Sequence, residues 1–86
     1  MVDPKAFEAI SEVRKRREQE IMTKKNVVGV GIGFKERGGT SSEELSLVVL
    51  VSQKLPEEDV APDDRIPLFL DGFPVDVQEV GKLKAF

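Results

Sequence analysis

The residues that could carry out chemistry in this chain are carboxylates, lysines and serines, because it contains no histidine and no cysteine. Without an imidazole or a thiol, the common pairs of nucleophile and base are missing, and no thiolate zinc site can form. Acidic residues gather around two prolines and near a later turn: Glu57, Glu58, Asp59, Asp63, Asp64, Asp71 and Asp76. They lack the spacing of a calcium loop. We predict a solvated acidic loop, with no catalytic residue, metal site or cofactor; a small carboxylate-based enzyme is the alternative.

A second candidate is the alternating glycine segment Gly29-Val30-Gly31-Ile32-Gly33. The dinucleotide fingerprint requires a glycine where this chain has Phe34, and it places its glycines in a turn before a helix. Here the glycines alternate with apolar residues, which is typical of a strand. We therefore predict a smooth sheet face that allows close approach of another backbone, or else a bulge or twist, rather than nucleotide binding.

The third candidate is the basic segment Arg14-Lys15-Arg16-Arg17, which could contact phosphates. Acids are interleaved with it, phenylalanine is the only aromatic residue type, and the net charge is −3. These features disfavour nucleic-acid binding, which is kept as the weakest alternative. Arg14 and Arg17 project toward the apolar side of the predicted helix, so we expect them to reach a carboxylate, with the acidic loop as a candidate partner.

Length and composition limit the chain to one small domain. Its 86 residues suffice for a single core, and 40% apolar with 34% charged residues is typical of a globular protein. The first residues lack the basic and apolar regions of a secretory signal, so we expect a cytoplasmic location and no membrane partner.

The pattern of apolar residues predicts one helix followed by four strands. Asp3-Pro4 is a helix start, and Asp71-Gly72 between apolar runs indicates a two-residue hairpin turn. Pro67 and Pro74 then occupy positions whose amides point away from the hairpin partner, which favours an edge position for the strand that holds Pro67. The expected elements are a helix at about 4–24 and strands at about 27–35, 45–52, 66–70 and 73–80, with a polar connection at 36–44.

The fold class that follows is α+β, in two layers, with the helix on one face of a four-stranded, largely antiparallel sheet. A single helix covers one face, so the opposite face should be bare, apolar and available for an interface. Val28, Val30, Ile32 and Phe34 are expected under the helix, together with alternate residues of the other strands. The predicted interface residues on the opposite face are Gly29, Gly31, Gly33, Val48, Leu50, Phe69 and Pro74.

Several segments resemble a known arrangement. These are residues 26–35, residues 51–56, Ile66-Pro67 and the Asp-Gly-x-Pro-x-Asp-x-x-Glu-Val-Gly stretch at 71–81. Together they are similar to the region that precedes a trypsin-like serine protease domain in a group of bacterial proteins. The resemblance covers roughly residues 20–86 and includes no residue of the protease triad. It implies a standalone or excised accessory domain whose bare sheet face contacts a protease domain or another protomer.

The sequence thus predicts a non-enzymatic accessory or protein-interaction domain. Its partner would be a protein, either a second copy in a homodimer or an adjacent protease-like domain, and neither nucleic acid nor a membrane is expected.

Overall fold

The chain forms one long helix, two short 3-10 turns and four strands in a computed structural model that describes residues 3–37 and 40–80. The strands that flank residues 38 and 39 continue further than predicted, so most of the expected polar connection is strand, and only its centre lies outside the described residues. In chain order the elements are α1 (Pro4–Met22), β1 (Val27–Arg37), β2 (Thr40–Val51), η1 (Glu57–Asp59), η2 (Pro62–Asp64), β3 (Phe69–Leu70) and β4 (Phe73–Glu79).

Helix α1 begins where the sequence predicts it. Asp3 caps the helix, and its side chain accepts a hydrogen bond from the backbone N–H of Lys5 at 3.0 Å. Pro4 occupies the first turn, where a missing N–H costs nothing. The helix ends at Met22, and Asn26 adopts a φ of 70°, which turns the chain into β1. Asn is one of the few residues other than glycine that adopt this left-handed conformation readily.

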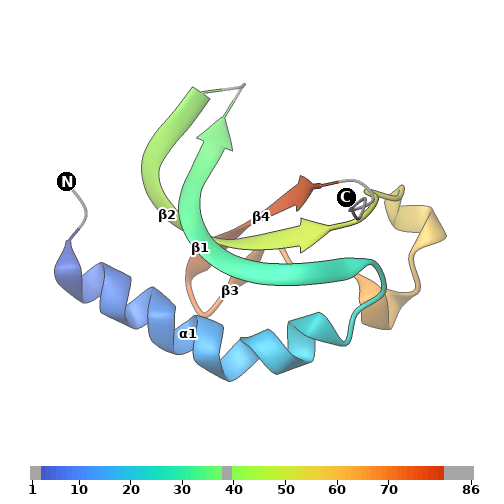
Figure 1. The fold of residues 1–86 in the computed structure, drawn as a ribbon, viewed down its shortest axis with the longest axis horizontal. Helices are drawn as coiled ribbons and strands as arrows, with labels where there is room; N and C mark the ends of the chain where they lie inside the picture. The colour runs from blue at the N-terminus through green and yellow to red at the C-terminus, as the bar shows by residue number, and fades with distance from the viewer. Residues whose placement is uncertain (1–2, 38–39, 81–86) are drawn as a thin grey trace, which may run out of the picture.

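The four strands form one mixed sheet in the order β1-β2-β4-β3, with α1 packed on one side (Figure 1). This confirms the two-layer α+β class. The pairs β1–β2 and β3–β4 are antiparallel, whereas β2 and β4 are parallel. The parallel pair arises because residues 52–68 carry the chain back before the second hairpin begins. Strands β1 and β3 are therefore the two edges of the sheet.

The second hairpin has the predicted register. Leu70 pairs with Phe73 and Phe69 pairs with Pro74. Asp71 and Gly72 both have positive φ, 49° and 87°, as a type I′ turn requires. Strand β3 is shorter than the predicted 66–70, but its edge position is confirmed.

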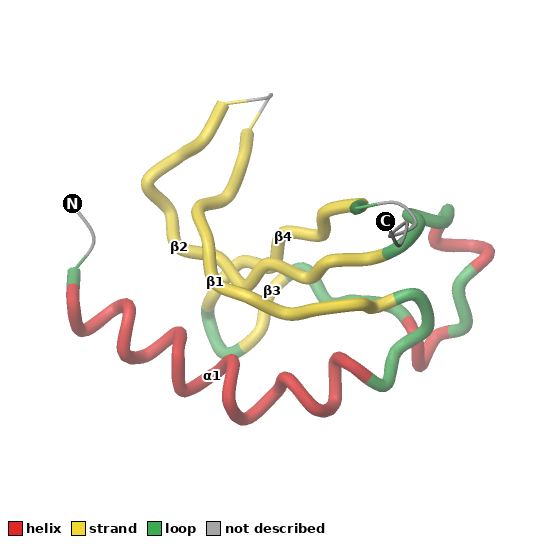
Figure 2. The backbone as a smooth tube through the Cα atoms, in the orientation of Figure 1, coloured by secondary structure: helices red, strands yellow, loops and turns green. Residues whose placement is uncertain are grey.

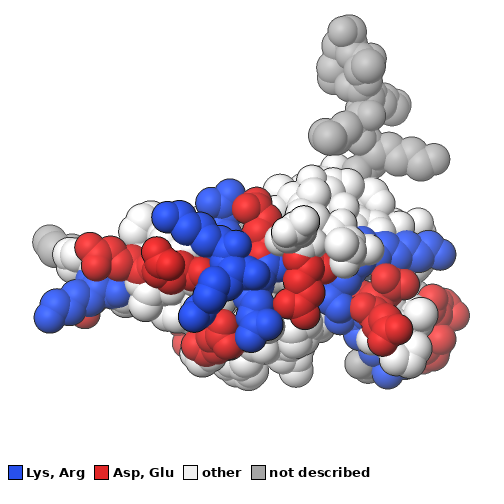
Figure 3. All heavy atoms as spheres, turned by 90° about the horizontal axis from the view of Figure 1, so that it is seen from below, with Lys and Arg blue, Asp and Glu red and all other residues white. Residues whose placement is uncertain are grey.

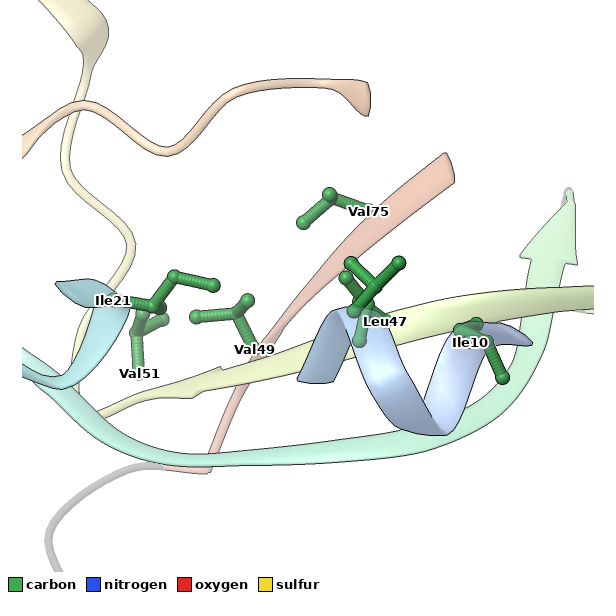
Figure 4. Close-up of a cluster of buried hydrophobic side chains, with 7 residues drawn as sticks. Ile10, Ile21, Leu47, Val49, Val51 and Val75 are labelled. Atoms are coloured by element: carbon green, nitrogen blue, oxygen red, sulfur yellow. The ribbon is translucent and has the colours of Figure 1, made fainter. Parts of the chain in front are cut away.

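The core lies between α1 and one face of the sheet (Figure 4). Val51 and Val75 line it, and Ile10, Ile21, Leu47 and Val49 are almost wholly buried there. Two residues expected under the helix are instead exposed, Val28 at 44% and Phe34 at 43%. Val28 lies within a register shift of the β1–β2 pair, which interrupts the alternation on which the prediction depended. Phe34 keeps the predicted alternation, because it pairs with Leu45 at the end of an unbroken ladder that begins at Gly29.

The free end of the β1–β2 hairpin bends away from α1 (Figures 1 and 2). This bend leaves Phe34 without cover from the helix. It also makes the sheet face opposite α1 the inner side of a curve, and that face holds the predicted interface.

Candidate functional site

The alternating glycines of β1 lie on the sheet face opposite α1, together with alternate residues of β2. Gly29 pairs with Leu50, Gly31 with Val48 and Gly33 with Ser46. Their β2 partners alternate with Leu47, Val49 and Val51, which face the core, so they point to the other side. The structure thus brings five of the seven predicted interface residues together: Gly29, Gly31, Gly33, Val48 and Leu50. We call this surface, with its neighbours on β4 and β3, the glycine face.

The glycines allow close packing inside the bend. A Cβ atom placed on Gly33 would lie 3.0 Å from Cγ2 of Val48, and one on Gly29 would lie 3.5 Å from Cδ1 of Leu50. By contrast, a Cβ on Gly31 would meet no atom within 4 Å. Side chains of β2 therefore occupy the space next to Gly29 and Gly33, whereas the space next to Gly31 is open.

The other two predicted interface residues differ from each other. Phe69 is 66% exposed on β3. Pro74 is buried, so its expected place on an open surface is wrong. One step back along the β2–β4 register places Pro74 beside Ser46, which is itself 0% exposed and donates from Oγ to the Gly33 carbonyl at 3.4 Å. The inner side of the bend encloses this part of the face.

Strand β4 adds two polar residues to this face that the predicted interface did not include. Asp76 lies beside Val48 and Gln78 beside Leu50. Gln78 Nε2 donates to Asp76 Oδ2 at 3.2 Å, and both side chains are half-buried. Asp76 and Gln78 follow Pro74 at every second residue of β4, so the alternation of strand side chains places them on the same face as Pro74. The glycine face is therefore apolar along β1 and β2, polar along β4, and less bare than predicted.

The outer edge of β1 carries backbone groups that no strand pairs, since β1 neighbours only β2 in the described sheet. Arg14 Nε donates to the carbonyl oxygen of Val30 at 3.4 Å, so this carbonyl points away from β2. Outward groups recur at every second residue of an antiparallel pair, so the N–H and C=O of Ile32 also point outward. Residues 27–34 contain no charge and no proline. We call this row the β1 edge.

The basic segment of α1 is engaged with acids. Figure 3 shows Lys and Arg interspersed with Asp and Glu on the helix side of the molecule. Arg17 Nη2 lies 3.3 Å from Asp71 Oδ1, and Arg16 Nη2 lies 3.4 Å from Asp71 Oδ2. The expected carboxylate partner is thus in the β3–β4 turn, and the suggestion that it comes from the acidic loop is wrong. The hydrogen bond from Arg17 lowers the pKa of Asp71.

The acidic loop instead contacts the end of the helix. Asp64 Oδ1 accepts a hydrogen bond from the backbone N–H of Lys25 at 3.0 Å, and Lys24 Nζ donates to the Asp63 carbonyl at 2.7 Å. Most of its described side chains are exposed, as expected of a solvated loop. Among the described residues no three carboxylates gather into a cluster that could hold a metal ion.

A pocket of about 390 Å³, which we call the crossover pocket, lies where residues 52–68 cross the end of the sheet. Sequence reasoning missed it, because its walls come from five separate parts of the chain. Its apolar lining is Val51, Leu55, Val60, Ile66, Leu68 and Val77, and its charged lining is Lys25, Lys54, Asp64 and Arg65.

Comparisons of the sequence with protein-family models and with curated proteins found no match. In the described part of the chain, no helix has both the length and the apolar character needed to cross a membrane.

Proposed function

We propose that this chain is a non-enzymatic protein-interaction domain, and that a second copy of the chain pairs with it along the β1 edge. The observation that carries the proposal is the row of outward backbone groups along residues 27–34 of β1, a stretch without charge or proline that Arg14 contacts at the Val30 carbonyl. Such an edge is a template for another strand unless a charge, a proline, shortness or a covering element blocks it.

The partner's own β1 fits this edge. Antiparallel pairing of two identical strands has twofold symmetry, so each outward N–H of one copy donates to an outward C=O of the other, and the reverse. In this arrangement the backbone groups of Ile32 bond across the interface, and Arg14 leaves the Val30 carbonyl. The glycine faces of the two copies then form one continuous surface. Because glycine has no side chain, nothing projects from this surface at Gly31.

The other two functions receive less support from the contacts. Asp71 is held by Arg16 and Arg17, and Asp76 by Gln78, so neither carboxylate is positioned as a free acid or base. The arginines that would contact nucleic acid are already paired with acids, Arg14 with Glu18 and Arg16 and Arg17 with Asp71. An adjacent protease-like domain, implied by the sequence resemblance, is the other protein partner, and a cytoplasmic location stays a prediction.

Sedimentation equilibrium of the full chain tests the proposal through Gly31→Lys. The open space at Gly31 accepts a side chain, and a lysine at a sheet edge opposes pairing. We expect a reversible dimer whose dissociation constant rises at least about tenfold in this variant. Gly31→Ala, which adds no charge, and Ala9→Lys, which adds the same charge on an exposed part of α1, should both dimerise normally.

Amide hydrogen exchange shows whether the edge itself is paired. The Ile32 N–H should gain protection as the concentration rises, whereas the Gly31 N–H, which points toward β2, should be protected at every concentration. A strict monomer at high concentration would remove the second-copy proposal and leave the protease-like domain as the partner to test. A dimer whose Ile32 amide stays unprotected would show that association occurs elsewhere.

A further inference from the structure

The crossover pocket has the size and the lining of a small-molecule site. Its volume of about 390 Å³ lies within the range of roughly 300–1,000 Å³ that is usual for ligand pockets. Such sites combine apolar walls with a few polar groups that orient the ligand. Here the floor is built by Val51 at the end of β2 and Val77 of β4, and the walls come from the crossover.

Three of its six apolar residues, Leu55, Val60 and Leu68, lie outside the core cluster. Ile66 and Val77 pack against the buried cluster, so their burial is explained by folding. Leu55 and Val60 are half-buried but do not belong to that cluster. Leu68, at 77% exposed, stands at the mouth. Apolar side chains that line a pocket without serving the core are the feature expected of a binding wall.

The charged lining of the pocket is net positive, although the whole chain is acidic. It consists of Lys25, Lys54 and Arg65 with one carboxylate, that of Asp64, which already accepts the Lys25 backbone N–H. Outside the lining, Glu79 Oε1 accepts the backbone N–H of Lys54 at 2.8 Å, so this nearby carboxylate is also engaged. Within the described residues, none of these three cationic side chains forms an ion pair, whereas Arg14, Lys15, Arg16 and Arg17 all do. The pocket therefore offers free cations beside an apolar cavity.

We propose that the crossover pocket binds a small amphiphile with an apolar body and a single anionic head, such as a medium-chain carboxylic acid. The apolar body lies against Leu55, Val60 and Val77, and the anionic head lies at the mouth near Lys54 and Arg65. No reaction is involved. The inference does not depend on the β1 edge, because it is carried by residues outside that edge.

The test is a titration of the full chain with octanoate, followed by backbone amide chemical shifts and by calorimetry. Saturable binding is expected, with shift changes confined to residues 25–26, residues 53–68 and the ends of β2 and β4. Octyltrimethylammonium has the same apolar body with the opposite charge, and butyrate has the same head with a shorter body. Both should bind at least about tenfold more weakly.

Two variants distinguish the contribution of the apolar wall to binding from that of the cations. Leu55→Ser should weaken octanoate binding about tenfold, because apolar contact is lost, while the matched change Phe7→Ser, at a half-exposed helix residue, should have no effect. Arg65→Gln should weaken octanoate binding and make it less dependent on salt. Circular dichroism confirms that each variant is folded.

Three outcomes would overturn the proposal. Equal binding of octanoate and octyltrimethylammonium would show that the cations do not select the ligand. Shifts that appear only with anionic phosphatidylglycerol vesicles, and not with free octanoate, would assign the surface to a membrane. Octanoate binding only after removal of residues 81–86 would show that these residues compete with the ligand for the pocket.

Discussion

The two edges of the sheet are built in opposite ways. Strand β3 is two residues long, follows Pro67, and leads into a turn that Arg16 and Arg17 hold against α1 through Asp71. Strand β1 is 11 residues long, and its residues 27–34 lack charge and proline. A short strand and a proline both hinder the addition of another strand, so the β3 edge is protected. Along residues 27–34 of β1, the hydrogen bond from Arg14 to the Val30 carbonyl is the contact that covers the edge. The difference points to β1 as the side for a partner.

Each edge strand pairs with one strand of the central β2–β4 pair. Removing a buried side chain from this pair should therefore have the largest effect on stability. Leu47→Ala empties a fully buried site and should lower the free energy of unfolding by about 2–5 kcal/mol. Urea unfolding followed by circular dichroism measures this, in a Gly31→Lys background so that association does not contribute. Leu50→Ala, on the half-buried glycine face, should cost less. If Leu47→Ala loosened β1 alone, the two edges would be independent and the comparison would fail.

A smaller effect distinguishes two glycines of the edge strand β1. Gly33→Ala should destabilise the fold by about 1 kcal/mol relative to Gly31→Ala, because the new methyl group would meet Val48 Cγ2 at 3.0 Å, whereas Gly31 has open space. Thermal unfolding of both variants measures the difference. Adding Val48→Ala to Gly33→Ala should restore most of the loss, and equal stability of the two single variants would contradict the inner packing of the bend.

The smallest effect concerns the β3 edge. Because Arg17 lowers the pKa of Asp71 in the folded chain, ionised Asp71 stabilises the fold above its unfolded pKa of 3.8. This stabilisation is lost as the pH falls through the lower folded pKa. Asp71→Asn, which keeps a residue suited to the I′ turn, should therefore be slightly less stable at pH 7 and should match the wild type in strong acid. Thermal unfolding at both pH values checks this, and a constant difference would contradict the ion pair.

Local chemistry made part of the fold predictable. Asp3-Pro4 and Asp71-Gly72 each fix a backbone conformation through a few adjacent residues, so the helix start and the hairpin register followed from the sequence. The parallel β2–β4 pair did not, because several strand orders bury the same alternate residues. The register shift at Val28 also interrupts the alternation in a way that the sequence pattern does not show.

The candidate site was predictable where one strand builds it. The grouping of the glycines with Val48 and Leu50 follows from alternation, and Asp76 and Gln78 would have followed from the same rule. The burial of Pro74 depends on the bend of a different hairpin. The crossover pocket depends on residues from five parts of the chain, and no local pattern indicates that they meet.

The contact between Gly33 and Val48 has a consequence for how this chain can change over generations. A larger residue at position 33 costs less stability when position 48 has already become smaller, so the order of two substitutions decides how stable the intermediate is. The packing of the curved hairpin thus couples substitutions at two positions that are fifteen residues apart in the sequence.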